Sequence, residues 1–293
     1  MFMISEIFKG RNRIFHLSNL GTLIFFILNI TLIYSVFGTM AGSSYPLLFY
    51  ILTVVISLSP IGEEFLCIVA GAQNIKRTDM KVHVIPLVEV VLDAAKEKSQ
   101  YHLEKIHVKV IRDDKPNAFA LGRRTLAVTE GLLQLPDEIV MAVIAHEIGH
   151  LAYGHTVIQL LIGGGNVFIS GCLFIIKIAC WAFTIIMGIV SAASRSGIMG
   201  IITAVFAGIS FGVMWIWVKF CSLFLMWSRR QNEFAADEYA AKLGFGYELA
   251  FALDYQICDI PHNGFFSALY SSHPNNNDRI AALQKMGVNY SRF

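Results

Sequence analysis

Four long apolar runs divide this chain. They cover residues 17–37, 45–61, 157–190 and 197–227. An α-helix needs about 20 apolar residues to cross a hydrocarbon core of about 30 Å. The pattern therefore predicts about four transmembrane helices. The last two runs exceed one crossing, which predicts helices that are tilted or that project from the bilayer.

The first run has the character of a retained anchor. Lys9, Arg11 and Arg13 precede it, as basic residues precede the apolar core of a signal peptide. Such a core is about 7–15 residues long, whereas this run covers residues 17–37. We therefore expect the run to stay in the protein as its first membrane span.

Residues 73–155 follow a different pattern, in which short apolar periods alternate with charged positions. The spacing of apolar positions predicts one amphipathic helix, and alternation of apolar and polar positions predicts strands. The predicted elements are a helix at residues 87–100 and strands at residues 105–112, 117–122 and 125–133.

Composition supports a membrane protein. Hydrophobic residues make up 55% of the chain and charged residues 15%, against about 25% charged residues in an ordinary soluble domain. Mean hydropathy is +0.59. We therefore expect the lipid bilayer as a partner. The net charge of +2 and the lack of a basic, aromatic-rich cluster predict no nucleic-acid partner.

Cations flank the apolar runs unevenly. The connections at residues 38–44 and 191–197 carry only Arg195, whereas Lys and Arg gather on the opposite side. The positive-inside rule then predicts a multi-pass protein of the cell (inner) membrane, with the polar segment and both termini in the cytoplasm. The cations on that side are Lys9, Arg11, Arg13, Lys76, Arg77, Lys81, Arg229 and Arg230.

The sequence HEIGH, residues 146–150, is the main chemical motif. Pro136 and the two acidic residues after it predict a helix that carries this motif. Residues four apart share a helix face, so His146 and His150 can bind one metal ion. Glu147 lies one position further round, where it can take a proton from a metal-activated water. The alternative is a chance match of these residue types.

His155 is a third nearby histidine that we do not expect to bind the metal. The metzincin pattern needs a glycine three residues after the second histidine, and Tyr153 holds that position. If the helix continues, His155 lies about 180° from His146, because each residue turns the helix by about 100°. We therefore expect His155 near the membrane surface or at a helix end.

A third ligand is needed, since hydrolytic zinc sites commonly use three protein ligands and one open position. The segment after the last apolar run offers Glu233, Asp237 and Glu238. Glu233 and Asp237 share a helix face, which suits a ligand and a carboxylate that orients a ligating histidine. Glu238 is displaced by about 140° from Glu233 and fits a solvated face. The alternative for the whole segment is an ordinary solvated helix.

Two further segments fit such a site. Residues 117–120, NAFA, precede the motif helix, and an edge strand there could pair with an extended peptide. His273 precedes a proline near the C-terminus, where a donor could stabilise an oxyanion. The alternatives are an interior strand and a structural hydrogen bond.

Four segments in this order, NAFALG, HEIGH, NEFAAD and HPNNNDRIAAL, resemble the HtpX-like membrane zinc metallopeptidases, relatives of the type-1 CAAX prenyl proteases. The layout is similar too, with two spans inserted between HExxH and ExxxD. Two features depart from the family. His155 stands where many members have an aspartate, and SPIGEE, residues 59–64, does not match. Both departures bear on substrate range.

The resemblance implies the roles of the site residues. One Zn²⁺ ion would be held by His146, His150 and Glu233, with Glu147 as general base and Asp237 behind the ligands. His273 would be a second catalytic residue. The implied substrate-binding residues are Asn117, Ala118, Phe119, Ala120 and Arg279.

The expected fold is an α+β integral membrane protein, mainly helical, with about four transmembrane helices. Its zincin-like catalytic domain would comprise the HExxH helix, a small β-sheet and the ExxxD helix. The expected segments are an N-terminal membrane anchor with two spans (1–72), a catalytic segment (73–155), two long transmembrane helices (156–228) and a C-terminal catalytic segment (229–293).

The expected function is zinc-dependent endopeptidase activity on polypeptides, chiefly membrane or misfolded proteins, at the cytoplasmic face. One alternative is a CAAX-type prenyl-peptide protease, which would need a large intramembrane chamber. Another is an inactive zinc-binding membrane scaffold, which would not need Glu147. A transporter with a coincidental HEIGH would leave Glu233 and Asp237 unexplained.

Overall fold

The computed structural model describes residues 16–35, 45–101, 103, 105–194, 197–255, 257 and 274–291. These residues are mainly helical and include one small mixed sheet, as the sequence predicts. The chain divides into two compact units. Unit 1 comprises residues 1–21, 56–161 and 226–293, and unit 2 comprises residues 22–55 and 162–225.

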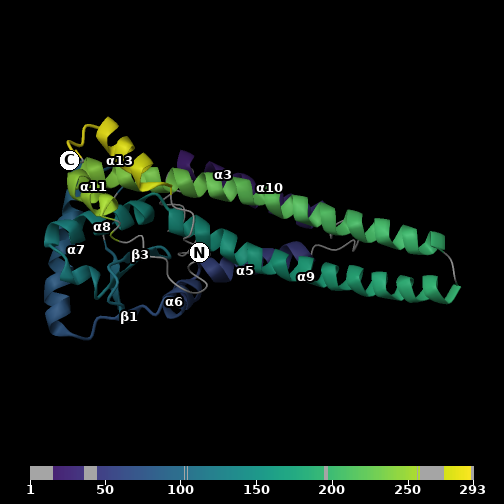
Figure 1. Cartoon of the computed structure of the whole chain (residues 1–293). Coiled ribbons are helices and arrows are strands. Elements are labelled where there is room, and N and C mark those ends of the chain that lie inside the picture. The colour runs from purple at the N-terminus through teal and green to yellow at the C-terminus, as the bar shows by residue number, and fades with distance from the viewer. Residues whose placement is uncertain are drawn as a thin grey trace. The chain divides into compact units, whose positions relative to one another are not determined.

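Unit 1 contains the four-stranded sheet, in the order β1-β2-β4-β3 (Figure 1). Strands β2 and β4 are parallel, with Val110 opposite Val128, and β3 pairs antiparallel with β4, with Phe119 opposite Ala127. The predicted strands are therefore present, and NAFA contributes to an edge strand. The strands are β1 (Gln73–Asn74), β2 (His107–Ile111), β3 (Ala118–Leu121) and β4 (Thr125–Thr129).

Strand β4 is buried on both faces because helices cover both sides of the sheet. Leu126 and Val128 point into the main core, with apolar residues of α7 (Thr78–Lys98) and α8 (Asp137–Ala152). Ala127 points to the other face, where it packs with Cys67 of α6 (Pro60–Val69). The α8 side of the sheet is the side that carries the HEIGH motif.

Helix α8 forms where the sequence predicts it. Pro136 is its N-cap residue, and two acidic residues occupy its first turn, which complements the positive end of the helix dipole. Val140, Ile144, Ile148 and Leu151 recur at helical spacing and are all buried. This apolar stripe fixes the rotation of α8 and therefore the face that presents the two histidines of the motif.

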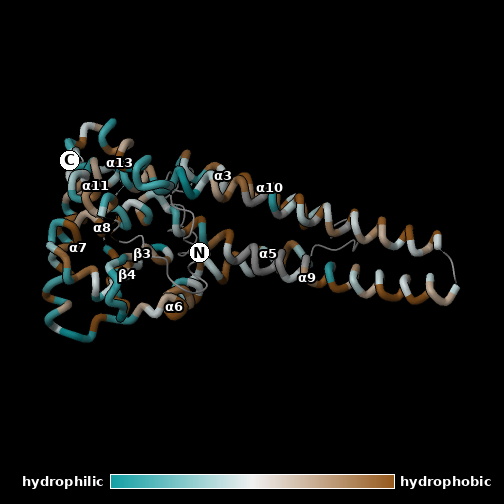
Figure 2. Tube along the Cα trace, in the orientation of Figure 1, coloured by the Kyte–Doolittle hydropathy of each residue, from teal (hydrophilic) through white to brown (hydrophobic). Residues whose placement is uncertain are grey.

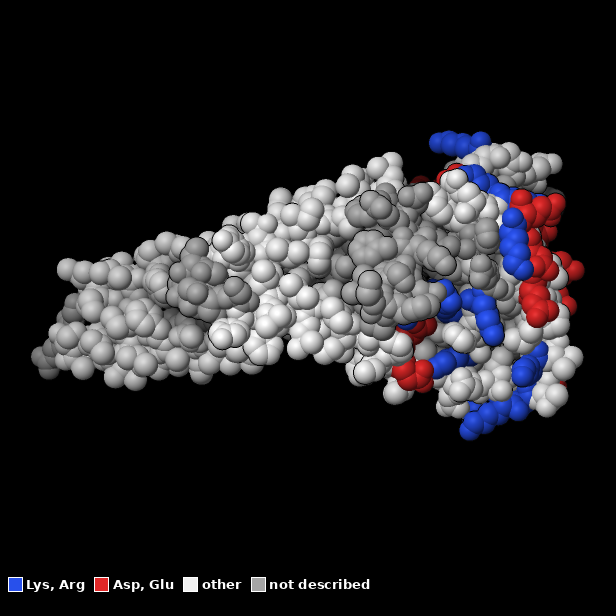
Figure 3. All heavy atoms as spheres, turned by 180° about the vertical axis from the view of Figure 1, so that it is seen from behind, with Lys and Arg blue, Asp and Glu red and all other residues white. Residues whose placement is uncertain are grey.

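The rest of unit 1 includes the short helix η3 (Leu132–Gln134) and the C-terminal helices α11 (Gly246–Asp254) and α13 (Asn276–Lys285). It also includes η1 (Leu17–Asn19), at the head of the first apolar run. Lys, Arg, Asp and Glu gather over unit 1 on the face shown in Figure 3.

Unit 2 consists of apolar helices. They are most of α3 (Leu20–Ile33) and α5 (Tyr45–Leu58), and parts of α9 (His155–Ser194) and α10 (Gly197–Leu243). Large apolar side chains such as Ile189 and Ile209 are more than half exposed, and the tube is mostly white and brown along these stretches of α9 and α10 (Figure 2).

Two helical stretches among the described residues, Lys177–Ser194 and Gly197–Trp217, are long and apolar enough to cross a membrane. Helices α5 and α6 pass the same test only as a pair, and they are bent by 66°. The apolar helix Leu17–Ile33 is shorter. The described residues thus offer two spans or up to three, so the count of four and the four-segment division of the chain stay predictions.

Candidate metal centre

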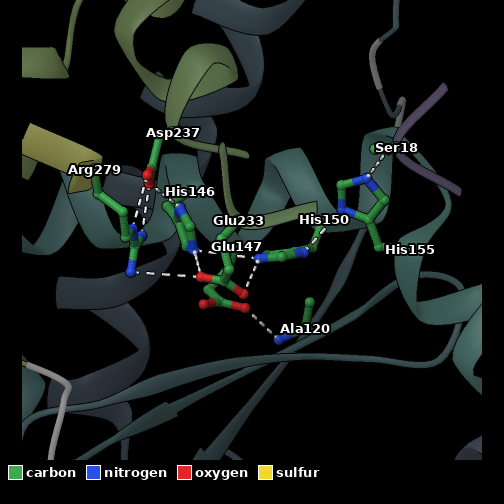
Figure 4. A network of polar contacts seen from close by, with 9 residues as sticks. All are labelled: Ser18, Ala120, His146, Glu147, His150, His155, Glu233, Asp237 and Arg279. Atoms are coloured by element: carbon green, nitrogen blue, oxygen red, sulfur yellow. Dashed lines mark hydrogen bonds and ion pairs between the residues drawn. The ribbon is translucent and has the colours of Figure 1, made fainter. Parts of the chain in front are cut away.

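Three buried side chains from two helices converge in unit 1 (Figure 4). Helix α8 supplies His146 and His150, and α10 supplies Glu233. One donor atom from each of the three lies within 4.8 Å of the other two. His146 Nε2 is 3.6 Å from Glu233 Oε2, and His150 Nε2 is 3.5 Å from Glu233 Oε1. The predicted ligand set is therefore one spatial group.

The two helices approach closely because α8 has a glycine, Gly149, between His146 and His150. A Cβ on Gly149 would lie 3.1 Å from the Cα of Ala236 and 3.1 Å from the Cβ of Tyr239, both on α10. Such contacts are tighter than packed side chains tolerate without a shift. Gly149 thus lets the backbones approach until Glu233 reaches the two imidazoles.

Asp237 lies behind His146. Its Oδ1 is 2.9 Å from His146 Nδ1, and its side chain is fully buried. With Nδ1 directed at this carboxylate, the Nε2 atom of His146 is left to face the ligand group. A carboxylate in this position fixes the tautomer and orientation of a ligating histidine.

Arg279 of α13 neutralises the buried carboxylates. Its guanidinium donates to both oxygens of Asp237, at 2.7 and 2.6 Å, and its Nη1 lies 3.4 Å from Glu233 Oε2. This two-point geometry is the strong form of an arginine–carboxylate pair. The resemblance grouped Arg279 with the substrate-binding residues; in the structure it is 4% exposed and paired with these carboxylates.

The pKa values reflect these contacts. Burial alone would raise the pKa of Asp237, but the charge and hydrogen bonds of Arg279 outweigh it and lower the pKa below its usual range. Burial alone would lower the pKa of His146, but hydrogen bonds with Asp237 and Glu233 outweigh it and raise the pKa to about 10. Without a metal ion, Asp237 and Glu233 thus favour the positively charged form of the His146 imidazole.

Glu147 lies beside the edge strand of the sheet. Its Oε2 accepts a hydrogen bond of 2.7 Å from the backbone N–H of Ala120 in β3. The HEIGH motif and the NAFA segment therefore meet at this contact, whose two residues are 27 positions apart in the chain. Asn117 is buried and bonded to the hairpin itself, since its N–H donates to Thr129 Oγ1 and its Oδ1 accepts from Ala118 N–H.

His155 lies at a helix end and outside the ligand group, as expected, but it is in contact with His150. Helix α8 ends at Ala152 and the chain turns at Gly154, whose φ of 69° suits glycine. His155 therefore starts a new helix, where it is fully buried, with its Nδ1 2.9 Å from Nδ1 of His150. It contributes no atom to the ligand group among the described residues. Burial and the neighbouring His150 hold the pKa of His155 well below its usual value.

The other predicted residues are placed as follows. Glu238 is partly exposed and forms an ion pair with Lys242, so it lies apart from the ligand group. His273 lies outside the described residues. Sequence reasoning missed Ser18, whose hydroxyl contacts His155. The only signal for it was a polar Ser-Asn pair at the head of an apolar run.

The ligand group fits a zinc ion. Two imidazole nitrogens and one carboxylate oxygen are zinc ligands, and three protein ligands leave a fourth position open, as in hydrolytic sites. The donor atoms are close enough for one ion, and Asp237 supplies the outer partner that ligating histidines usually have. Zinc is thus the metal that the donor set favours.

Comparisons with known proteins identify the family of this chain. The family model described as Peptidase family M48 matches residues 86–287. Protease HtpX of Hahella chejuensis (strain KCTC 2396) is 32% identical over 223 residues, which are 66% of this chain and 70% of that protein. A Protease HtpX homolog of Bordetella avium (strain 197N) is 33% identical over 196 residues, or 60% of this chain and 63% of the homolog.

A solved structure shows the same fold. The crystal structure of S. mikatae Ste24p matches with a TM-score of 0.50 at 16% identity, covering 96% of this chain and 66% of that chain. The chain thus spans roughly two thirds of the lengths of these relatives. The resemblance based on the motifs is confirmed. Because the family model covers the helices that carry His146, His150 and Glu233, the chain belongs to peptidase family M48.

Proposed function

We propose that this protein is a zinc-dependent endopeptidase of the cell membrane that hydrolyses membrane or misfolded proteins at the cytoplasmic face. The observation that carries the proposal is the buried group of His146, His150 and Glu233, with the Glu147 carboxylate beside it (Figure 4). Membership of peptidase family M48 supports it.

The residues divide the chemistry among them. Zinc bound to the ligand group would supply Lewis-acid polarisation of the scissile carbonyl and of a water molecule. Glu147 takes the proton from the attacking water and delivers it to the leaving nitrogen as the peptide bond breaks. Asp237 and Arg279 hold His146 in the orientation that directs its Nε2 atom at the ligand group.

The edge strand β3 is the proposed substrate platform. It is the last strand of the sheet, so an extended peptide can add to its open side. The Ala120 N–H on this strand donates to Glu147, so a peptide at this edge passes next to the proposed base. Ala118, Phe119 and Ala120 would supply backbone contacts, while Asn117 shapes the hairpin.

The membrane location rests on unit 2. Two of its helical stretches can cross a membrane by length and composition, and their large apolar side chains are exposed, as lipid contact requires. The cations flanking the apolar runs support a cytoplasmic site. Single cysteines introduced at Ser43 and Ser194 should therefore react with an impermeant reagent outside the cell, and one at Lys115 should not.

The activity is tested on the purified full chain in detergent, with casein as substrate. Wild-type protein should contain one zinc ion per chain and cleave casein in a chelator-sensitive manner. Glu147→Gln should keep its zinc and lose cleavage, because an amide cannot take the proton. Retained turnover in this variant, or wild-type protein without zinc, would refute the proposal.

The same preparations separate the alternatives. A prenyl-peptide protease would cleave a prenylated peptide and leave casein and the unprenylated peptide intact. An inactive scaffold would bind zinc and cleave neither substrate. The endopeptidase proposal requires casein cleavage without a prenyl group.

A further inference from the structure

We propose that His155 and Ser18 form a positioning pair for His150, so that the segment ahead of α3 is part of the metal centre. This inference rests on the proposed function, because it assigns to His150 the role of zinc ligand. It concerns two residues that touch neither the substrate nor the metal in the proposed mechanism.

The pair forms a chain of contacts that leads away from the ligand group (Figure 4). His150 Nδ1 lies 2.9 Å from His155 Nδ1, and His155 Nε2 lies 2.9 Å from Ser18 Oγ. His155 is fully buried and Ser18 is 5% exposed. Ser18 Oγ in turn lies 2.8 Å from His16 Nδ1.

One arrangement of protons satisfies each of these contacts between His150, His155, Ser18 and His16. A ligating His150 needs an unprotonated Nε2, the atom that faces Glu233, so its proton is on Nδ1. This N–H then donates to Nδ1 of His155, whose own proton is on Nε2 and donates to Ser18 Oγ. The Ser18 hydroxyl is left to donate to His16. His155 thus plays for His150 the part that Asp237 plays for His146.

Ser18 is itself held from two sides. Ser228 of α10 donates from its hydroxyl to the Ser18 carbonyl at 2.7 Å. The side chain of Asn19 donates to the Tyr153 carbonyl, in the turn that joins α8 to α9, at 3.1 Å. The segment is therefore bonded both to the helix that carries Glu233 and to the turn beside His150, which fixes the hydroxyl that orients His155.

The positioning role predicts a graded loss of zinc affinity in the full-length protein. His155→Leu keeps the volume but removes the acceptor, and should weaken zinc binding by about 10–100-fold. His155→Asn places an amide oxygen where Nδ1 lies and should restore most of the affinity. Ser18 is one contact further from the metal, so Ser18→Ala should lower zinc affinity only a few-fold.

The measurements are zinc affinity, by competition with a chromogenic chelator, and the visible absorption of the Co²⁺-loaded protein. The Co²⁺ bands should shift in His155→Leu and return toward wild type in His155→Asn. Thr156→Val is the matched control. Thr156 is buried next to His155, and its hydroxyl has no hydrogen-bond partner among the described residues, so this variant should match wild type in both measurements.

The outcomes separate this inference from the proposed function. Wild-type zinc affinity in His155→Leu, or equal losses in His155→Leu and His155→Asn, would overturn the positioning pair and leave the zinc site intact. Wild-type protein that binds no zinc would refute both. If His155→Leu fails to fold, His155→Asn and Ser18→Ala still test the pair. Weaker zinc binding with a shifted Co²⁺ spectrum in Ser18→Ala supports the pair. Wild-type zinc affinity and a wild-type Co²⁺ spectrum in Ser18→Ala overturn it.

A different observation, on α6, carries a second inference. One face of this helix is apolar and exposed: Ile61 is 73% exposed, Phe65 62% and Ile68 69%. Their spacing of four and three residues places them in one stripe. We infer that this stripe lies in the interface of a lipid bilayer.

The opposite face of α6 contacts the sheet, where Glu63 accepts a hydrogen bond of 2.6 Å from Thr125 Oγ1. The exposed Glu64 borders the apolar stripe, and its Oε2 lies 2.7 Å from Lys109 Nζ. Cys67 is buried in the small apolar cluster beneath β4. These contacts fix the rotation of the helix, so the apolar stripe is directed away from the sheet.

The bilayer is the occupant that the chain connection indicates. Helix α5, a run of 14 mostly apolar residues with exposed side chains such as Leu48 and Phe49, leads into α6 through the single residue Ser59. The two helices are bent by 66°. An amphipathic helix that leaves a membrane-inserted segment at such an angle is placed to lie along the bilayer surface.

The test uses the full chain in phosphatidylcholine vesicles, with a fluorescent amino acid at position 65. The control is the same label at Val90, an exposed apolar residue of α7. Nitroxide lipids should quench the label at 65 and iodide should not, whereas iodide should quench the label at 90. Equal quenching of both positions by iodide, or protection of position 65 from both quenchers, would overturn the inference.

Discussion

Glycines in the two units have different surroundings: Gly149 of unit 1 lies against the backbone of another helix, whereas the described glycines of unit 2 face open space or, at Gly200, only the Ser191 hydroxyl. In unit 1, a Cβ on Gly149 would lie 3.1 Å from the α10 backbone at Ala236. In unit 2, a Cβ on Gly163, Gly208 or Gly212 would meet no described atom within 4 Å. Positioning three ligand atoms requires close contact between helices, whereas lipid-facing helices require only apolar surface. The same residue type therefore has different importance in the two units.

The largest effect on zinc binding is expected from removing the Glu233 carboxylate of unit 1. Glu233→Ala should nearly abolish zinc binding, because two imidazoles alone rarely hold zinc in a hydrolytic site. Glu238→Ala is the matched control on the same helix, since Glu238 pairs with Lys242, and it should bind zinc as wild type does. Metal analysis after dialysis measures both. If Glu238→Ala lost its zinc and Glu233→Ala kept it, Glu238 would be the ligand and Glu233 would not.

A smaller loss is expected when the partner behind His146 is removed. Asp237→Ala should weaken zinc affinity by about 10–100-fold. It also leaves the buried Arg279 guanidinium with less compensation, so the free energy of unfolding should fall by about 3–5 kcal/mol. Chelator competition and denaturant unfolding measure these quantities. Full zinc loss in Asp237→Ala, with retention in Glu233→Ala, would make Asp237 the ligand.

The helix contact itself can be changed by one methyl group. Gly149→Ala should push α8 and α10 apart by a few tenths of an ångström, because the atoms it meets belong to the α10 backbone and to a Cβ. Overpacking of this kind lowers the free energy of unfolding by about 1–3 kcal/mol. Zinc affinity should fall together with stability. Unchanged zinc affinity would show that the site tolerates a wider separation.

The smallest effect is expected from the same substitution in unit 2. Gly208→Ala and Gly212→Ala should leave zinc content and casein cleavage at wild-type values, because a methyl group there meets no described atom. Alanine also favours a helix over glycine by about 1 kcal/mol. A loss of activity in either variant would mean that these glycines pack against another surface.

Much of unit 1 follows from the sequence. The alternation at residues 105–112 predicted β2, and NAFALG and TLAVTEGLL predicted β3 and β4, although β4 ends at Thr129 and the predicted strand runs on into η3. The helical spacing of His146 and His150, and of Glu233 and Asp237, predicted that these side chains share helix faces, and the structure brings them together. These features are local, because residues a few positions apart have a relative orientation fixed by the helix or strand itself.

The features that the sequence did not reveal depend on tertiary contacts. The sequence left open whether the helix continues through His155; Gly154 takes a positive φ, and a new helix starts at His155, which brings this side chain against His150. The contact of Ser18 with His155 joins residues 137 positions apart. The pairing of Arg279 with Asp237 joins residues 42 positions apart. Periodicity carries no information on such distant pairs.

The central claim, that His146, His150 and Glu233 bind one zinc ion, is tested most directly by X-ray absorption at the zinc edge of the purified full chain. We predict one zinc per chain, with only nitrogen and oxygen neighbours at about 2.0–2.2 Å and the outer-shell signature of two imidazoles. Sulfur neighbours at about 2.3 Å, which would indicate ligation by cysteine, or an unchanged spectrum in His150→Ala, would contradict it.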